Sequence, residues 1–386
     1  MSDPLAPHSA ILDPAPTERT WPLYAVLFAS IGIVVGLIWD ISWHRSIGRD
    51  TFWSPPHVLE QVAALVAGLS CGWLVLHTTF AGGPAASRGV RFWGFRGPLG
   101  AWLCIWGALM MLVSAPFDNW WHNAYGLDVK IMSPPHAVLA WGMLAIQIGA
   151  MLMALARQNR APPAEQRRLG RLYAASAAIF LTMHATVLME YAAFPNHMHS
   201  ALFYRLTALG MPLILVATAR PSRLRWPATT AAGLYLLIVL LLIWALQLTP
   251  ATARLAPIYH PITRMVPPPF PLLLVVPALA IDLLLRRGPR RAWPLAAALG
   301  ASFVVLMLAV HWWWADFLLS PAARNFVFGA DQWDYSARLG AWRYQFWNLQ
   351  SGTGALLRGL AIAMLSAILT SRLGLWIGSG MARVQR

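Results

Sequence analysis

Apolar runs of about 20 residues, the length that crosses a bilayer, recur along the chain from Trp21 to Trp376. Composition agrees, since 58% of the 386 residues are hydrophobic and only 11% are charged, against about a quarter in soluble domains. A soluble enzyme is therefore excluded, and the pattern predicts an all-α, polytopic transmembrane helical bundle. About ten spans are expected. They are 22–43, 56–78, 99–121, 135–156, 171–193, 200–219, 227–248, 269–286, 293–315 and 354–376.

The charges indicate how the spans are oriented. The chain has 29 Lys and Arg against 14 Asp and Glu, a net charge of +15. Arginine clusters, such as those in 88–96 and 286–291, lie in short loops between apolar runs, where positive charge marks the cytoplasmic side. We therefore expect a cytoplasmic N-terminus and a lipid bilayer as the partner. Nucleic acid is excluded as a partner.

The spans divide the chain into five regions. Segment 317–352 is long for a connection and mixes aromatic with charged residues, so we expect an interfacial helix or a cap over the outer face. The five regions are a cytoplasmic tail (1–21), a metal-binding four-span core (22–157), five further spans (158–316), the outer segment (317–352), and the last span with a cytoplasmic C-terminus (353–386).

A motif occurs twice within the four-span core. Residues 40–57 read DISWHRSIGRDTFWSPPH and residues 118–136 read DNWWHNAYGLDVKIMSPPH, so both contain D-x-x-W-H and end in S-P-P-H. The spacings of the Asp and the two His are 4 and 13 in the first copy and 4 and 14 in the second. The repeated residues are Asp40, His44 and His57, and Asp118, His122 and His136.

The spacing of the motif suits a metal ion. Residues four apart share a helix face, and a proline pair suits the start of the next helix, which places the last histidine in its first turn. Ionisable groups at membrane depth are costly, and metal coordination would offset that cost. The sequence therefore predicts a tandem repeat of two metal-binding helical hairpins. Two histidines and one carboxylate suit non-haem iron, zinc or copper, and the spacing does not choose among them.

Other residues are weaker candidates. Glu60 lies one turn beyond His57 and is expected to orient an imidazole. Cys71 and Cys104 both fall inside apolar runs, so we predict neither a disulfide framework nor a thiolate metal cluster from them. A third hairpin offers weaker metal ligands, which are Glu190, His197 and His199.

The first copy resembles the C subunit of particulate methane and ammonia monooxygenases, and the resemblance covers about residues 22–150. In that family the Asp and two His of the motif bind copper, which implies Asp40, His44 and His57 as copper ligands. A second family copper site has Asn and two His at spacings that Asp118, His122 and His136 match, with Asp in place of Asn. The matching residues of the first copy are Asp40, Trp43, His44, Arg49, Asp50, Thr51, Phe52, Pro55, His57 and Glu60.

The resemblance implies a copper-dependent membrane monooxygenase, or a subunit of one, in a bacterial inner membrane. It would hydroxylate a small apolar or ammonia-like substrate with O2, using one or two mononuclear copper ions on the periplasmic side. Such chemistry implies an electron donor and further membrane or periplasmic subunits as partners. The alternative is a non-catalytic protein for copper acquisition or delivery, or a structural metal-binding membrane protein. The expected catalytic residues are Asp40, His44, His57 and Glu60, with Trp43, Phe52 and Trp53 as walls of a dry pocket.

Overall fold

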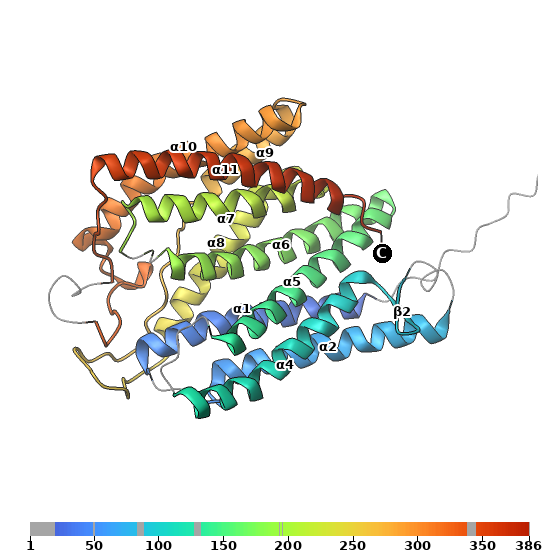
Figure 1. The fold of residues 1–386 in the computed structure, drawn as a ribbon, viewed down its shortest axis with the longest axis horizontal. Coiled ribbons are helices and arrows are strands. Elements are labelled where there is room, and N and C mark those ends of the chain that lie inside the picture. Colours follow the sequence, from blue (N-terminus) through green and yellow to red (C-terminus); the bar gives the residue numbers. More distant parts are fainter. Residues whose placement is uncertain are drawn as a thin grey trace, which may run out of the picture.

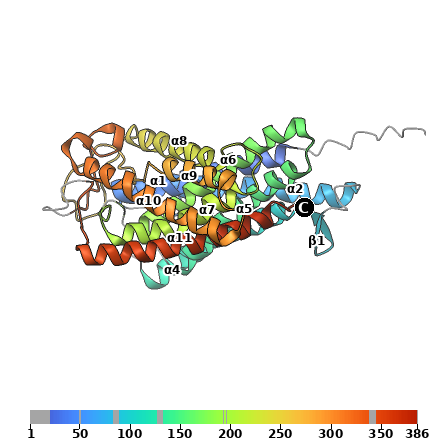
Figure 2. The same ribbon diagram turned by 90° about the horizontal axis from the view of Figure 1, so that it is seen from above.

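The computed structural model describes residues 20–48, 51–82, 89–126, 133–192, 194, 196–337 and 345–385, and most of these are helical. Nine helices among them are long and apolar enough to cross a membrane, which marks a multi-pass membrane protein. They run side by side along one axis in Figures 1 and 2. The nine are α1 (Trp21–Ser46), α2 (Pro55–Ala81), α4 (Leu99–Tyr125), α5 (Pro134–Arg160), α6 (Pro163–Tyr191), α7 (Ala201–Ala219), α8 (Pro227–Gln247), α10 (Ala292–Leu319) and α11 (Thr353–Met381).

Helices α1 and α4 finish, and α2 and α5 begin, at one end of the bundle, which we call the histidine end. Proline pairs open both α2 and α5, at Pro55–Pro56 and Pro134–Pro135. A proline suits the first helical turn because its missing N–H would have no partner there. At the opposite end, β1 (Val90–Phe92) and β2 (Phe95–Gly97) form a small antiparallel hairpin between α2 and α4.

Glycine pairs bring the backbones of α4 and α5 into direct contact. A methyl group on Gly107 would lie 2.6 Å from the Gly142 carbonyl oxygen, and one on Gly142 would lie 2.7 Å from that of Gly107. Gly100 and Gly149 face each other in the same way, so a methyl group on either would meet the carbonyl oxygen of the other. In each helix the two glycines are seven residues apart and so share a face. Small residues permit close helix approach in membranes, and here they fix how α4 and α5 align.

A similar close contact joins α1 to α2. A methyl group on Gly36 of α1 would lie 2.5 Å from Cγ of Glu60 on α2. The glycine therefore leaves room for a buried carboxylate side chain between the two helices. This contact sets α1 against the first turns of α2 at the histidine end.

The prediction of a full-length helix over 269–286 is wrong. The helix there is α9 (Val275–Arg287), which has only 13 residues. Prolines 267, 268, 269 and 271 precede it, and proline in a helix interior removes a hydrogen bond and clashes with the preceding turn. The residues before α9 are mostly buried, as non-helical backbone at membrane depth must be.

Side chains of neighbouring helices satisfy the carbonyl groups of this non-helical stretch. The Ser42 hydroxyl of α1 donates to the Val266 carbonyl oxygen at 2.9 Å, and the Tyr235 hydroxyl of α8 donates to that of Pro271 at 3.0 Å. The stretch thereby ties the histidine end of α1 to α8 and α9.

Long connections cover the histidine end of α1. The backbone N–H of Tyr335 donates to the Arg45 carbonyl at 3.4 Å, and that of Tyr259 donates to the Tyr335 carbonyl at 2.9 Å. Gly48 has a φ of +82°, and a side chain there would collide with the Tyr335 hydroxyl. For segment 317–352 the sequence predicts an interfacial helix or a cap over the outer face. Its described part contains the end of α10 and two short 3-10 turns, η1 (Pro321–Ala323) and η2 (Phe326–Phe328), rather than an interfacial helix. Residues 338–344 of that segment lie outside the described residues.

We predict that Gly107→Ala destabilises the protein, because the added methyl group must displace the backbone of α5. The expected loss is about 1–3 kcal/mol in the free energy of unfolding, which is typical of overpacking. Gly72→Ala in α2 is the control, since nothing lies within 4 Å of the methyl group that it adds. Detergent-to-SDS unfolding titrations measure both, and equal stability of the two variants would contradict the close contact of α4 and α5.

Candidate metal centre

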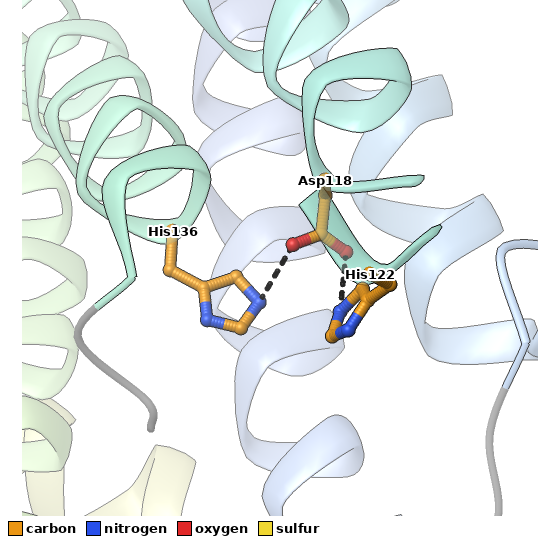
Figure 3. Close-up of side chains that lie close together, drawn as sticks. All are labelled: Asp118, His122 and His136. Carbon is orange, nitrogen blue, oxygen red and sulfur yellow. Dashed lines mark ion pairs between the residues drawn. The ribbon is translucent and has the colours of Figure 1, made fainter. Parts of the chain in front are cut away.

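Asp118, His122 and His136 meet at the mouth of the α4–α5 hairpin. Figure 3 shows the carboxylate of Asp118 between the two imidazole rings. Its Oδ2 lies 3.1 Å from Nε2 of His122, and its Oδ1 lies 3.4 Å from Nε2 of His136. One ligand atom from each residue lies within 4.8 Å of the others. His136 lies in the first turn of α5, as the proline pair before it predicts.

A hydrogen bond to the other ring nitrogen of His122, Nδ1, determines which of its two nitrogens carries the hydrogen. Nδ1 of His122 lies 3.2 Å from the Gly126 carbonyl oxygen. A carbonyl oxygen only accepts, so Nδ1 carries the hydrogen, and Nε2 of the neutral ring presents a lone pair to the carboxylate. Nε2 of His122 and Oδ2 of Asp118 then both present lone pairs to each other at 3.1 Å. The two atoms repel each other unless a cation lies between them. That cation is either a proton on Nε2 or a metal ion.

The spacing of the ligand atoms fits a metal ion. Bonds of about 2.0–2.2 Å to imidazole nitrogen and carboxylate oxygen, at roughly tetrahedral angles, put neighbouring ligand atoms a little over 3 Å apart. The two contacts of Asp118 lie at 3.1 and 3.4 Å. Oδ1 of Asp118 is also buried with no hydrogen-bond partner among the described residues, which is costly for a carboxylate oxygen. The donor set and its spacing therefore fit a first-row transition metal with open positions.

Asp40 occupies the same place in the α1–α2 hairpin. Its Oδ1 lies 3.2 Å from Nε2 of His57, and its Oδ2 lies 3.9 Å from Nε2 of His44. As in the other hairpin, Oδ1 is buried and has no hydrogen-bond partner within the described part of the chain. The His44 side chain is 49% exposed, and this group is looser than that of Asp118. A turn of the His44 side chain toward Asp40 would be needed to complete three ligands here.

His57 is oriented by the same kind of second contact. Its Nδ1 lies 3.0 Å from the Thr51 carbonyl oxygen and 3.1 Å from the Ser54 hydroxyl, which itself donates to the Thr51 carbonyl at 2.6 Å. Nδ1 therefore carries the hydrogen, and Nε2 faces Asp40 with its lone pair. Metal-binding histidines commonly donate their other N–H to a carbonyl group in this way.

Glu60 distinguishes the first hairpin from the second. It is 3% exposed and close enough to interact electrostatically with both Asp40 and His57. The corresponding position in the second hairpin, three residues after His136, is the apolar Leu139. The first hairpin therefore holds a second carboxyl group, and the second hairpin does not.

The expected dry pocket around the first group is not formed by Phe52 and Trp53. These side chains are 42% and 75% exposed, and their rings contact each other edge-on. Trp43 is partly buried and packs against the core. Arg49 and Asp50, which belong to the family motif, lie outside the described residues.

The third hairpin does not gather Glu190, His197 and His199 into one ligand group. Glu190 is exposed, and His197 is partly buried. Nε2 of His199 lies 3.3 Å from Oδ1 of Asp316 and 3.1 Å from the Trp312 carbonyl oxygen, both on α10. Since the carbonyl can only accept, this nitrogen carries a hydrogen and is not a metal ligand in this arrangement.

Sequence reasoning missed the groups that orient the imidazoles. The carbonyls of Thr51 and Gly126 are backbone groups, and nothing in a side-chain pattern marks them. Gly126 nevertheless offered a signal, because a glycine four residues after His122 is a common helix end and has here a φ of +100°. Asp316 was not paired with His199 because more than a hundred residues separate them in sequence.

No family model, no curated protein and no solved structure matches this chain. The resemblance to monooxygenase C subunits accordingly rests on the motif residues alone.

We predict that metal binding at Asp118 releases protons. Metal ions bind imidazole and carboxylate ligands in their deprotonated forms, so binding competes with protons and affinity falls as pH is lowered. Zn²⁺ titration calorimetry near neutral pH, in buffers with different ionisation enthalpies, measures this release. The test compares Asp118→Asn with His77→Gln, a histidine on α2 that stacks on Trp73. Identical proton release in wild type and Asp118→Asn would refute the assignment.

We also predict that Ser54→Ala weakens metal binding by the first hairpin, because the hydroxyl group that helps to orient His57 is lost. Loss of such an orienting group typically costs about 10–100-fold in affinity. The measurement is made in an Asp118→Ala background, so that only the first hairpin binds. Ser133→Ala at the equivalent position of the second hairpin serves as control and should leave this affinity unchanged, whereas equal effects would rule out a specific role for Ser54.

Proposed function

We propose that this chain is a copper protein of a bacterial inner membrane that uses O2 to oxidise a small apolar or ammonia-like substrate. The observation that carries the proposal is the placing of Asp40 and Asp118, each with a buried oxygen facing an imidazole Nε2 at the mouth of a helical hairpin. Each group, with two imidazoles and one carboxylate, suits a single ion. The two hairpins together would be a duplicated metal-binding unit holding one or two mononuclear ions.

Copper is the proposed metal on two grounds. Imidazole ligands suit copper, and at N/O sites copper binds more tightly than the other divalent first-row metals. The motif from Asp40 to Glu60 resembles that of monooxygenase C subunits, where the Asp and two His are copper ligands. Iron and zinc are compatible with the same ligand types, and metal analysis decides among them.

The residues around the first hairpin suit oxidation chemistry better than those around the second. Asp40, His44 and His57 would hold the ion, and the bound copper would supply the one-electron chemistry that activates O2. Glu60, buried beside Asp40 and His57, is placed to accept or deliver a proton at its carboxyl group. The more compact Asp118 group, with Leu139 in place of a glutamate, would be an auxiliary site.

The surroundings define the proposed partners. The histidine end would face the periplasm, because the arginine clusters lie in the loops at the opposite end and positive loops stay in the cytoplasm. A small apolar substrate would reach the hairpins through the lipid. Exposed Phe52 and Trp53 next to His57 offer a surface for a further subunit, and an electron donor must come from outside this chain.

A second function, copper acquisition or delivery without catalysis, is favoured by the solvent exposure of His44. Its 49% exposure and its distance of 3.9 Å from Asp40 would allow an ion to exchange at that face. The two functions differ in one result, since delivery predicts copper binding without O2 consumption.

The test is metal analysis and turnover of the purified protein in lipid. Wild type is expected to retain up to two copper ions at the histidine end, whereas Asp40→Ala and His57→Ala each lose one of these and abolish O2-dependent product formation. Glu60→Gln should keep its copper but turn over about 10²–10⁴-fold more slowly, the usual cost of losing a general acid–base group.

His77→Gln is the control and should behave as wild type. Equal metal content in wild type and in both metal-ligand variants would contradict metal binding at the first hairpin. Copper loss in those variants with no turnover in wild type, even with a chemical reductant, would favour acquisition or delivery.

A further inference from the structure

Three sulfur atoms converge in the middle of the four-span core, far from the histidine end. The Cys71 thiol of α2 lies 3.9 Å from Sδ of Met153 on α5. The Cys104 thiol of α4 lies close enough to that of Cys71 to interact with it electrostatically. Neither cysteine forms a disulfide, and both are 0% exposed, with Met153 at 3%. The three side chains come from three different helices.

Glycines make room for two of the three sulfur side chains. A methyl group on Gly149 would lie 2.5 Å from Sγ of Cys104, and one on Gly100 would lie 2.7 Å from Cγ of Met153. The close contact of α4 and α5 therefore also brings Cys104 and Met153 together between the helices. The Cys104 thiol donates its one hydrogen to the Ile146 carbonyl oxygen at 3.6 Å, a weak bond that leaves its sulfur lone pairs available.

The ligand set indicates which ion it would take. Thiolate and thioether sulfur are soft ligands that select Cu(I), whereas hard ions such as Mg²⁺ and Ca²⁺ require oxygen. A thioether is not among the usual ligands of Zn²⁺, which prefers thiolate, imidazole and carboxylate. Two cysteines alone do not make a metal site, which is why the sequence predicts no thiolate cluster from them, but Met153 provides the third sulfur for a trigonal arrangement.

Charge also favours a monovalent ion at this depth. An unpaired charge in a membrane core is costly, so a bound ion must be neutralised within its own ligand set. Cu(I) bound to one thiolate, one thiol and one thioether has no net charge. A divalent ion with the same set would leave a net positive charge in an apolar core.

We propose that Cys71, Cys104 and Met153 form a buried Cu(I) site. Binding forms one Cu–thiolate bond and releases one thiol proton to solvent, while the other thiol and the thioether bind as neutral ligands and copper stays in the Cu(I) state. Cys71 lies 14 residues from His57 along α2, and Cys104 lies 14 residues from Asp118 along α4. At 1.5 Å per residue, about 21 Å separates this site from the histidine end. The proposal does not depend on copper binding or catalysis at the Asp40 and Asp118 groups.

The experiment titrates the reduced full-length protein in detergent with Cu(I), in competition with a chromophoric Cu(I) chelator. An Asp40→Ala, Asp118→Ala background removes the carboxylates of the two histidine-end groups. One equivalent of Cu(I) is expected to bind, with an X-ray absorption spectrum that shows only sulfur neighbours. Cys71→Ala, Cys104→Ala and Met153→Leu should each lower the affinity at least tenfold.

Two further variants separate a lost ligand from a lost fold. Met143→Leu changes another buried methionine of α5 and should leave Cu(I) affinity unchanged. Gly149→Ala keeps all three sulfur atoms but displaces Cys104, and should weaken binding in protein that still elutes as a single species.

Three results would overturn the proposal. The first is no competitive Cu(I) binding in the background protein. The second is nitrogen or oxygen neighbours in the absorption spectrum, and the third is a Cys71–Cys104 disulfide in the protein as isolated from membranes.

Discussion

A carboxylate held against two imidazoles at the mouth of a membrane helix hairpin needs a cation. In both hairpins the aspartate has a buried oxygen that faces an imidazole Nε2 and that makes no hydrogen bond to any residue the structure describes. In both, one imidazole has its Nδ1 fixed by a backbone carbonyl, so the lone pair of Nε2 points at the carboxylate. The proposed metal chemistry follows from this one electrostatic constraint.

The rest of the bundle holds these side chains in place. The glycine contacts of α4 and α5 align Asp118 with His136, and Gly36 lets α2 approach α1 closely enough to bury Glu60. The connections over the histidine end fasten Arg45, which directly follows His44, through the backbone of Tyr335. Helix packing in the core therefore determines ligand spacing at the surface.

Much of this arrangement could be predicted from the sequence, because it is local. Residues four apart share a helix face, and a proline pair starts a helix, so the neighbours of Asp40 and Asp118 follow from spacing. The short α9 could have been predicted as well, since prolines 267–271 forbid a helix there. Contacts between distant segments could not be predicted, because they depend on how whole helices pack. Examples are the pairing of His199 with Asp316, and the contacts among Cys71, Cys104 and Met153.

The central claim is that a metal ion lies between each aspartate and its histidines. The most direct measurement is anomalous X-ray scattering from crystals of the copper-loaded protein, collected on both sides of the copper absorption edge. The account predicts a copper peak beside Asp118, His122 and His136, and a second beside Asp40 and His57. Loaded crystals with no anomalous density at either aspartate, and with both carboxylates simply paired to protonated imidazoles, would contradict it.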